Sequence, residues 1–260
     1  MDLTWFDSNT WLIEMGHQRI LLDPWLVGPL VFGNLPWLFK GERSTPRSIP
    51  DSIDLILLSQ GLEDHAHPPT LKALDRQIPV VASPSAAKVA QDLGYSQVTP
   101  LAHGETFTLP NCLEIHALPG SPIGPMTIEN GYLLRDLITS ASLYYEPHGF
   151  HHPSLKAFAP VDVVLTPIAN LSIPLLGPVI KGQQSALEVL QWLTPQFVLP
   201  TAAGGDFIIE GLLKFLLRAE GTSQEFQDLL AAQGCATQLI EPTPGQRCEL
   251  VLQTRQVTVP

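Results

Sequence analysis

Two carboxylates and two imidazoles lie within five residues, directly after an apolar run. Residues 53–58 have the length and composition of a buried strand. The polar residues that follow it include Glu63, Asp64, His65 and His67. Ligands bind at the carboxyl ends of strands in α/β proteins, and these residue types either bind a divalent metal ion or transfer protons. The spacing therefore predicts a chemical site, and a solvated loop before a helix is the alternative.

A second group of the same kind follows the strand expected at residues 142–145. Glu146, His148, His151 and His152 lie within seven residues. Successive side chains of an extended chain point to opposite sides, so at most one of the last two faces the same site as Glu146 or His148. We expect Glu146 or His148 to meet Asp64 at one site.

Composition excludes several classes of function. The 260-residue chain has 14 Lys and Arg residues against 25 Asp and Glu residues, a net charge of -11, which disfavours nucleic acid as a partner. Its three cysteines form no CxxC pair, which is typical of a reducing compartment. The most apolar segment, residues 20–39, contains Asp23, Asn34 and three prolines, so we expect no transmembrane helix. These features predict a soluble, cytoplasmic protein.

Residues 25–39 form an apolar segment that Gly and Pro residues interrupt. Such a loop either packs over the core or forms an exposed patch for a hydrophobic ligand, a membrane surface or another protein. Its candidate surface residues are Trp25, Phe32, Trp37 and Phe39. A second apolar loop that prolines interrupt, residues 171–180, could contribute to the same surface.

The order of expected elements indicates one α/β domain over residues 1–260. Antiparallel strands come first, then strands alternate with helices, and a similar series follows in a second half, with the halves near residues 1–125 and 126–260. Residues 207–218 are strongly apolar and are predicted to form one helix.

This order of motifs resembles the metallo-β-lactamase-fold superfamily, and most closely its branch of ascorbate-6-phosphate lactonase-like hydrolases. The resemblance spans the chain and rests on the strand ending at Leu22-Asp23-Pro24, the strand before Asp64-His65, the turn at residues 118–121, the strand before Glu146 and the strand ending at Pro200. It implies a four-layer αββα sandwich. It also implies one or two divalent metal ions bound where these strands end.

Most of the metal-binding histidines of that family are absent. The signature His-x-His-x-Asp-His reads Gln60-Gly61-Leu62-Glu63-Asp64-His65 here. Ser121 stands at the next histidine, Glu146 at the bridging aspartate, and Thr201, Ala202 and Ala203 at the last histidine. The resemblance then implies a single ion, Zn, Mn or Fe, held by Asp64, His65 and either Glu146 or His148.

Three functions follow from these residues. The first is a mononuclear metal-dependent hydrolase acting on an unidentified small molecule, either polar or hydrophobic, with Glu63 or His67 transferring protons. The second is a metal-free enzyme in which Asp64, His65 and Glu146 act as general acid and base, and Gln60 or backbone N–H groups hold an oxyanion. The third is a binding or assembly module without catalysis, which works through the apolar loops 25–39 and 171–180.

Overall fold

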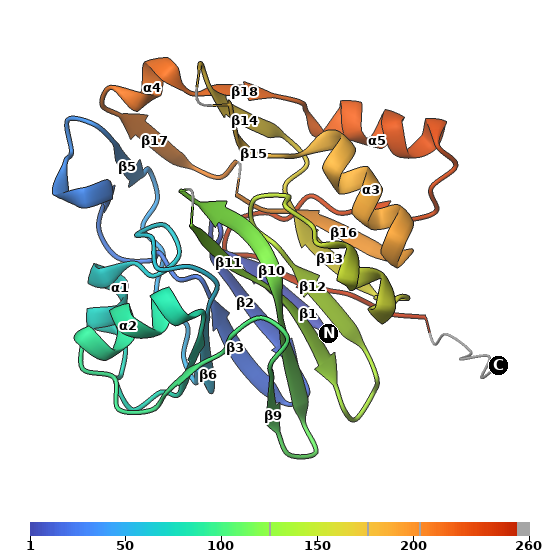
Figure 1. Cartoon of the computed structure of the whole chain (residues 1–260), viewed down its shortest axis with the longest axis horizontal. Helices are drawn as coiled ribbons and strands as arrows, with labels where there is room; N and C mark the ends of the chain where they lie inside the picture. Colours follow the sequence, from blue (N-terminus) through green and yellow to red (C-terminus); the bar gives the residue numbers. More distant parts are fainter. Residues whose placement is uncertain (125, 176, 203, 254–260) are drawn as a thin grey trace.

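Two seven-stranded sheets pack face to face, with helices on their outer faces (Figure 1). The computed structural model describes residues 1–253 apart from 125, 176 and 203. The layers are helix, sheet, sheet and helix, so the predicted αββα sandwich is confirmed. Among the described residues, no helix is long and apolar enough to cross a membrane.

The first sheet consists of an N-terminal antiparallel meander followed by three further strands that pair in parallel. Its strand order is β20-β1-β2-β3-β6-β7-β8. The strands are β1 (Asp2–Trp5), β2 (Trp11–Met15), β3 (Gln18–Leu22), β6 (Leu55–Leu58), β7 (Val80–Ala82), β8 (Val98–Pro100) and β20 (Arg247–Glu249). Strands β3, β6, β7 and β8 are parallel, so the ends of β3 and β6 lie side by side. Helices α1 (Pro68–Ala73) and α2 (Pro84–Asp92) follow β6 and β7.

The second sheet has the order β19-β16-β13-β12-β11-β10-β9. Its strands are β9 (Thr106–Leu109), β10 (Leu113–Ile123), β11 (Thr127–Asp136), β12 (Ser142–Tyr145), β13 (Val163–Thr166), β16 (Phe197–Pro200) and β19 (Gln238–Leu239). Its helical elements are η2 (Pro153–Phe158), α3 (Gln183–Leu193) and α5 (Ser223–Ala232). Strand β12 runs parallel to β13 and antiparallel to β11.

Successive side chains of a buried strand point to opposite faces of the sheet and therefore pack into two different hydrophobic cores. In β6, Leu55 and Leu57 join the cluster between the two sheets, whereas Ile56 and Leu58 pack against α1 and α2. All four side chains are almost completely inaccessible, as expected for a parallel strand covered on both faces. The sandwich thus fixes the end of β6, from which the candidate site extends.

Two small three-stranded sheets stand at the same end of the sandwich. One has the order β17-β5-β4, and the other β15-β14-β18. They consist of β4 (Leu30–Val31), β5 (Lys40–Arg43), β17 (Phe207–Glu210), β14 (Asn170–Ile173), β15 (Gly177–Ile180) and β18 (Arg218–Glu220), with η1 (Phe32–Asn34) and α4 (Leu213–Leu216) beside them.

The prediction of one helix over residues 207–218 is wrong. The segment forms β17, the short helix α4 and β18 instead. Gly211 has φ +94°, and a Cβ there would lie 2.7 Å from the carbonyl oxygen of Leu38. Because only glycine adopts this backbone conformation readily, a helix cannot continue through it.

Candidate metal site

Three side chains from loops of opposite sheets converge at the carboxyl ends of β6 and β12. Asp64 and His65 lie in the loop between β6 and α1, and His148 lies three residues after β12. One donor atom from each residue lies within 4.8 Å of the donor atoms of the other two. The rings of His65 and His148 meet edge to face at 5.1 Å. This set of two imidazoles and one carboxylate matches the ligands of mononuclear catalytic sites.

Asp23 holds His65 in this position, a role that the sequence did not reveal. Asp23 directly follows β3, and its Oδ2 lies 2.7 Å from His65 Nδ1. The same buried carboxylate accepts hydrogen bonds from the Ser59 backbone N–H at 2.7 Å and from the Tyr145 hydroxyl at 2.6 Å. With Nδ1 bound to Asp23, His65 directs Nε2 toward Asp64, at 3.2 Å. The sequence did contain a signal for this contact. Asp23 directly follows β3, and a residue at the end of a strand that pairs in parallel with β6 must lie beside the loop that follows β6.

The charges of the three candidate ligands affect one another's pKa. Burial alone would lower the pKa of His65, but the carboxylates of Asp64 and Asp23 outweigh it and raise the pKa to about 10. Burial raises the pKa of Asp64, but the adjacent His65 imidazolium outweighs it and lowers that pKa overall. Burial, helped by the positive charge of His65, lowers the pKa of His148 to about 3. Without metal, the site thus holds a His65 imidazolium between two carboxylates and a neutral His148.

Gln60 and Ser121, which the sequence resemblance matches to histidines of the family, contact His148. The Gln60 amide nitrogen donates to the Ser121 hydroxyl at 2.8 Å and lies 2.9 Å from His148 Nδ1. The Ser121 hydroxyl is also 2.9 Å from that nitrogen. Gln60 and Ser121 therefore support the imidazole ring of His148.

Glu146 lies close by but is not part of the three-residue cluster. Its Oε2 accepts hydrogen bonds from the backbone N–H groups of Phe150, at 2.7 Å, and His148, at 3.1 Å. Its Oε1 is buried and has no partner among the described residues. Burial raises the pKa of Glu146 to about 7, against the effect of these backbone donors. Glu146 thus fixes the turn that presents His148.

Glu63 and His67 connect the site loop to the apolar loop 25–39. Glu63 Oε1 accepts a hydrogen bond from the Gly33 N–H at 2.9 Å. His67 Nε2 lies 3.2 Å from the Pro29 carbonyl oxygen, and its Nδ1 lies 3.0 Å from the Thr70 hydroxyl. Burial lowers the pKa of His67 to about 4. Both side chains therefore form contacts that stabilise the apolar loop 25–39 against the site loop.

Residues of the apolar loop are divided between core and surface. Trp25 and Phe39 are buried in a small cluster with Leu30, and Phe32 packs against its edge. Trp37, in contrast, is 64% exposed. Of the four candidate surface aromatics, only Trp37 is largely exposed.

At the position that the sequence resemblance matches to the final histidine of the family, the described residues Thr201 and Ala202 direct no donor toward the cluster. Thr201 is buried, accepts from the Trp11 indole N–H at 3.0 Å and donates to the Ser8 carbonyl at 3.2 Å. Ala202 has no side-chain donor, and Ala203 lies outside the described residues.

Two features of the described site fit a bound cation. Asp64 Oδ1 is buried without a hydrogen-bond partner among the described residues, and the donor atoms of Asp64, His65 and His148 lie within 4.8 Å of one another. Unpaired buried oxygens are costly unless an ion or water satisfies them. The donor set and the unpaired oxygen of Asp64 together fit one divalent ion.

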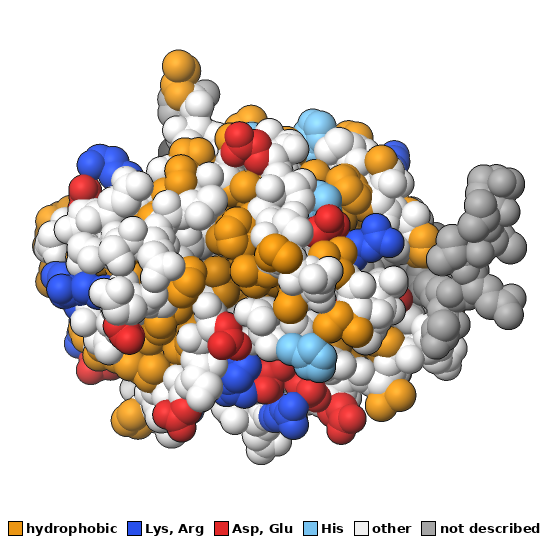
Figure 2. Space-filling model, turned by 90° about the horizontal axis from the view of Figure 1, so that it is seen from below, with side chains coloured by type: hydrophobic (Ala, Val, Ile, Leu, Met, Phe, Trp, Pro, Cys, Tyr) orange, Lys and Arg blue, Asp and Glu red, His pale blue; other side chains and the backbone are white. Residues whose placement is uncertain are grey.

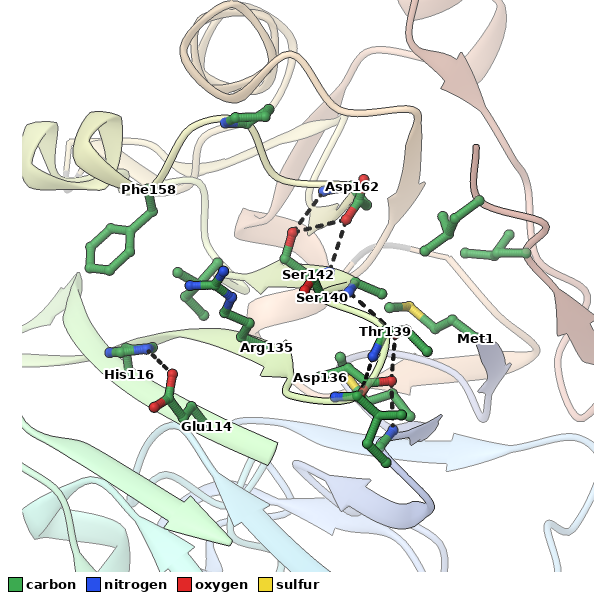
Figure 3. Close-up of a pocket in the computed structure, with 18 of the residues that line it drawn as sticks. Met1, Glu114, His116, Arg135, Asp136, Thr139, Ser140, Ser142, Phe158 and Asp162 are labelled. Atoms are coloured by element: carbon green, nitrogen blue, oxygen red, sulfur yellow. Dashed lines mark hydrogen bonds and ion pairs between the residues drawn. The ribbon is translucent and has the colours of Figure 1, made fainter. Parts of the chain in front are cut away.

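A groove outside the candidate metal site lies at the other end of the sandwich. It has a volume of about 990 Å³ and is lined by the turns after β2 and β11 and by residues 157–160. Figure 2 views the molecule from this end, with apolar side chains gathered across its middle. Figure 3 shows His116, Arg135 and Phe158 at one side of the groove and Asp136 and Thr139 at another. None of its lining residues belongs to the metal cluster.

Comparison with known proteins supports the same fold. The family model described as a beta-lactamase superfamily domain matches residues 2–202. No curated protein matches the chain in sequence. An isothiocyanate hydrolase from Delia radicum gut bacteria has a similar structure, with a TM-score of 0.70 and 16% identity over 96% of this chain and 99% of that one.

Two further solved structures are similar over nearly their full lengths. Igni18, a metallo hydrolase from the archaeon Ignicoccus hospitalis, has a TM-score of 0.68 and 17% identity over 96% of this chain and 99% of its own. The metallo-beta-lactamase fold protein YhfI from Bacillus subtilis has a TM-score of 0.63 and 14% identity over 95% and 99%. At these identities the likeness shows the fold.

Proposed function

Because this chain belongs to the metallo-β-lactamase superfamily, we propose that it is a hydrolase that uses one divalent metal ion. The ligands are Asp64, His65 and His148, and the metal is Zn, Mn or Fe. The observation that carries the proposal is the convergence of their donor atoms within 4.8 Å beside the unpaired Oδ1 of Asp64. Glu146, the alternative third ligand, instead accepts hydrogen bonds from its own turn.

The bound ion would supply an acidified water and a Lewis acid for a carbonyl or phosphoryl oxygen. The protein supplies the geometry. Asp23 fixes the His65 ring and stabilises its position from the side away from Asp64. Gln60 and Ser121 fix the His148 ring through Nδ1. Such supporting contacts to ligand histidines usually change metal affinity by about 10- to 100-fold.

Proton release accompanies ligand formation at His65. Its imidazolium carries a proton on both nitrogens, because its pKa is about 10. The nitrogen that Asp23 holds keeps its proton, and Nε2 must lose its own before it can act as a ligand. Binding of a metal ion at neutral pH would therefore release about one proton per chain from this residue.

Metal analysis of protein purified without a polyhistidine tag tests the proposal. We expect about one Zn, Mn or Fe ion per chain after reconstitution and dialysis, and a large loss of bound metal in Asp64→Ala and His148→Ala. His103→Ala is the matched control, because this exposed histidine lies outside the cluster. Substoichiometric metal in the wild-type protein, or equal metal in all variants, would refute the mononuclear site.

A second function is favoured by the line of Asp23, His65 and Asp64. His65 lies 2.7 Å from one carboxylate and 3.2 Å from the other, which is the geometry of a general acid held by two anions. In this case the metal-free protein hydrolyses small ester substrates, and Asp64→Ala abolishes that activity. Activity that appears only after metal is restored would exclude it.

A further inference from the structure

Asn9 is a buried amide beside the candidate metal site, and the hydrolase assignment gives it no role. It lies in the turn between β1 and β2 and is only 2% exposed. Its Nδ2 lies 3.4 Å from His65 Nε2, the ring nitrogen that faces Asp64. Its Oδ1 is buried and has no hydrogen-bond partner among the described residues. A buried amide that leaves an oxygen unpaired is costly, so the side chain is expected to serve a further group.

The two ends of the Asn9 amide can exchange places. The carbonyl oxygen and the NH₂ group of an asparagine are almost equal in size, and a half-turn of the amide interchanges them. Oδ1 accepts no hydrogen bond from the described residues, so the half-turn breaks none at that end. It brings the carbonyl oxygen to the place of Nδ2, next to His65 Nε2. Asn9 can therefore present an oxygen donor at the point where Asp64 and His65 meet.

The spacing around His65 Nε2 is that of atoms bound to one ion. Nitrogen and oxygen ligands bind zinc at about 2.0–2.2 Å, so two ligands of the same ion lie about 3–3.5 Å apart. Asp64 Oδ2 lies 3.2 Å from His65 Nε2, and the nearest amide atom of Asn9 lies 3.4 Å from it. Both separations fall within that range, which fits all three side chains on one ion.

The turn that carries Asn9 is held firmly in an unusual conformation. Asp7 and Ser8 both have positive φ, at +79° and +50°, which residues other than glycine rarely adopt. The Ser8 carbonyl oxygen accepts a hydrogen bond from the Thr201 hydroxyl at 3.2 Å, and the buried Asp7 carboxylate pairs with Arg43 at 3.1 Å. Backbone strain that surrounding contacts maintain is typical of functional sites. Here it directs the side chain of Asn9 to the metal cluster.

A neutral oxygen ligand suits the charge of this site. Asp23 and Asp64 already place two carboxylates against His65. A further carboxylate would add repulsion between like charges in a buried region, whereas the asparagine carbonyl supplies an oxygen donor without charge. Carbonyl oxygens are ordinary ligands of divalent ions that prefer oxygen, such as Mn²⁺.

We propose that Asn9 is a fourth protein ligand of the metal ion and binds it through Oδ1. This role rests on the hydrolase assignment and adds one neutral donor to Asp64, His65 and His148. Four protein donors leave a position for water only on an ion with five or more ligands. We therefore expect a five-coordinate ion in the wild-type protein, in place of the four-coordinate ion that three protein ligands and a water would give.

Metal affinity and the visible spectrum of bound Co²⁺ test this role. Asn9→Leu keeps the approximate size of the side chain and removes both polar atoms. We expect its affinity for Zn²⁺ and Co²⁺, measured by competition with a chromophoric chelator, to fall at least about tenfold. Its Co²⁺ absorption should become stronger, because four-coordinate Co²⁺ absorbs visible light more strongly than five-coordinate Co²⁺.

Asn9→Asp separates a metal ligand from a hydrogen-bond donor. Aspartate keeps an oxygen at the same place and adds a negative charge, so it should bind metal at least about fivefold more tightly than wild type. If Asn9 only donated a hydrogen bond to His65, loss of its NH₂ group would weaken metal binding as Asn9→Leu does. This second variant keeps the test decisive where Asn9→Leu does not fold.

Two control variants make matching changes elsewhere in the fold. Asn111→Asp adds the same charge in the exposed turn between β9 and β10. Thr237→Val removes a buried hydrogen bond to the Pro195 carbonyl oxygen. Both should bind metal within about twofold of wild type, and thermal unfolding in a chelator shows which variants are folded.

Three results overturn the role of Asn9. The first is a metal affinity of Asn9→Leu within about twofold of wild type, the second is an unchanged Co²⁺ spectrum in that variant, and the third is weaker metal binding in Asn9→Asp. If the wild-type protein still binds about one metal ion per chain, such a result removes Asn9 from the ligands and leaves the hydrolase assignment intact. A wild-type protein that retains no metal refutes the hydrolase assignment itself.

Discussion

Asp23→Asn is the sharpest test of how the metal site is built. Asp23 is fully buried, and its two oxygens contact Ser59, His65 and Tyr145. The asparagine amide has one acceptor oxygen in place of two, so its NH₂ group must face at least one of these donors. The substitution also removes one of the two carboxylates that neutralise the His65 imidazolium in the metal-free protein.

The magnitude follows from the contacts that are lost. A hydrogen bond to a charged group contributes about 1.5–3 kcal/mol, and leaving a buried charge partly unpaired costs about 3–5 kcal/mol. Because Asp64 still pairs with His65, we expect a loss of about 3 kcal/mol in the unfolding free energy of the metal-free protein. Metal affinity should fall about 10- to 100-fold, since His65 is no longer oriented.

Urea unfolding in a chelator measures the first effect, and competition with a chromophoric chelator measures the second. Asp92→Asn is the control, because Asp92 forms an exposed ion pair with Lys88 and should cost less than about 0.5 kcal/mol. If Asp23→Asn matched this control in stability and bound metal within twofold of wild type, Asp23 would not hold His65 as described.

Three further predictions follow from the same contacts. The pKa of His65 is about 10 in the folded protein and near its ordinary value of 6.5 in the unfolded chain. Protonated His65 therefore stabilises the metal-free fold fully below pH 6.5, and this stabilisation is lost as the pH rises through 10. Urea midpoints measured in the presence of a chelator should fall across that pH range. Gln60→Leu removes the amide next to His148 Nδ1 and should weaken metal binding about tenfold in chelator competition, with a circular dichroism spectrum like that of wild type. Gly211→Ala should lower the unfolding free energy measured in urea by about 1–3 kcal/mol, because the φ of Gly211 is +94° and Leu38 leaves no room for a Cβ. Gly104→Ala should lower it by less, because a Cβ at Gly104 would meet no neighbour within 4 Å.

The sandwich could be predicted because local patterns determine it. Residues 55–58 are uniformly apolar, as a strand covered on both faces must be, and the polar groups after β6 and β12 fall where parallel strands end. The sequence could therefore place Asp64, His65 and His148 at one edge of the fold. The patterns carry no information on which side chain turns inward at that edge.

The parts that escaped prediction depend on contacts distant in sequence or on backbone geometry. The bond from Asp23 to His65 spans 42 residues and exists only once β3 and β6 are paired. Glu146 accepts hydrogen bonds from its own turn, an alternative that composition cannot distinguish from metal binding. The apolar run at residues 207–218 predicts one helix, but the left-handed backbone at Gly211 divides it into a strand and a short helix.

The candidate ligands come from loops of two different sheets, and this has a consequence for folding. An ion held by Asp64, His65 and His148 would join the β6 loop of one sheet to the β12 loop of the other, as the Tyr145–Asp23 hydrogen bond already does. The free energy of metal binding would therefore oppose separation of the two sheets rather than local unfolding of one loop. The stabilisation of the folded protein would grow with the ratio of metal concentration to Kd. Amides in both sheets should exchange more slowly with solvent when metal is added. A bound metal ion would thus link the two sheets reversibly.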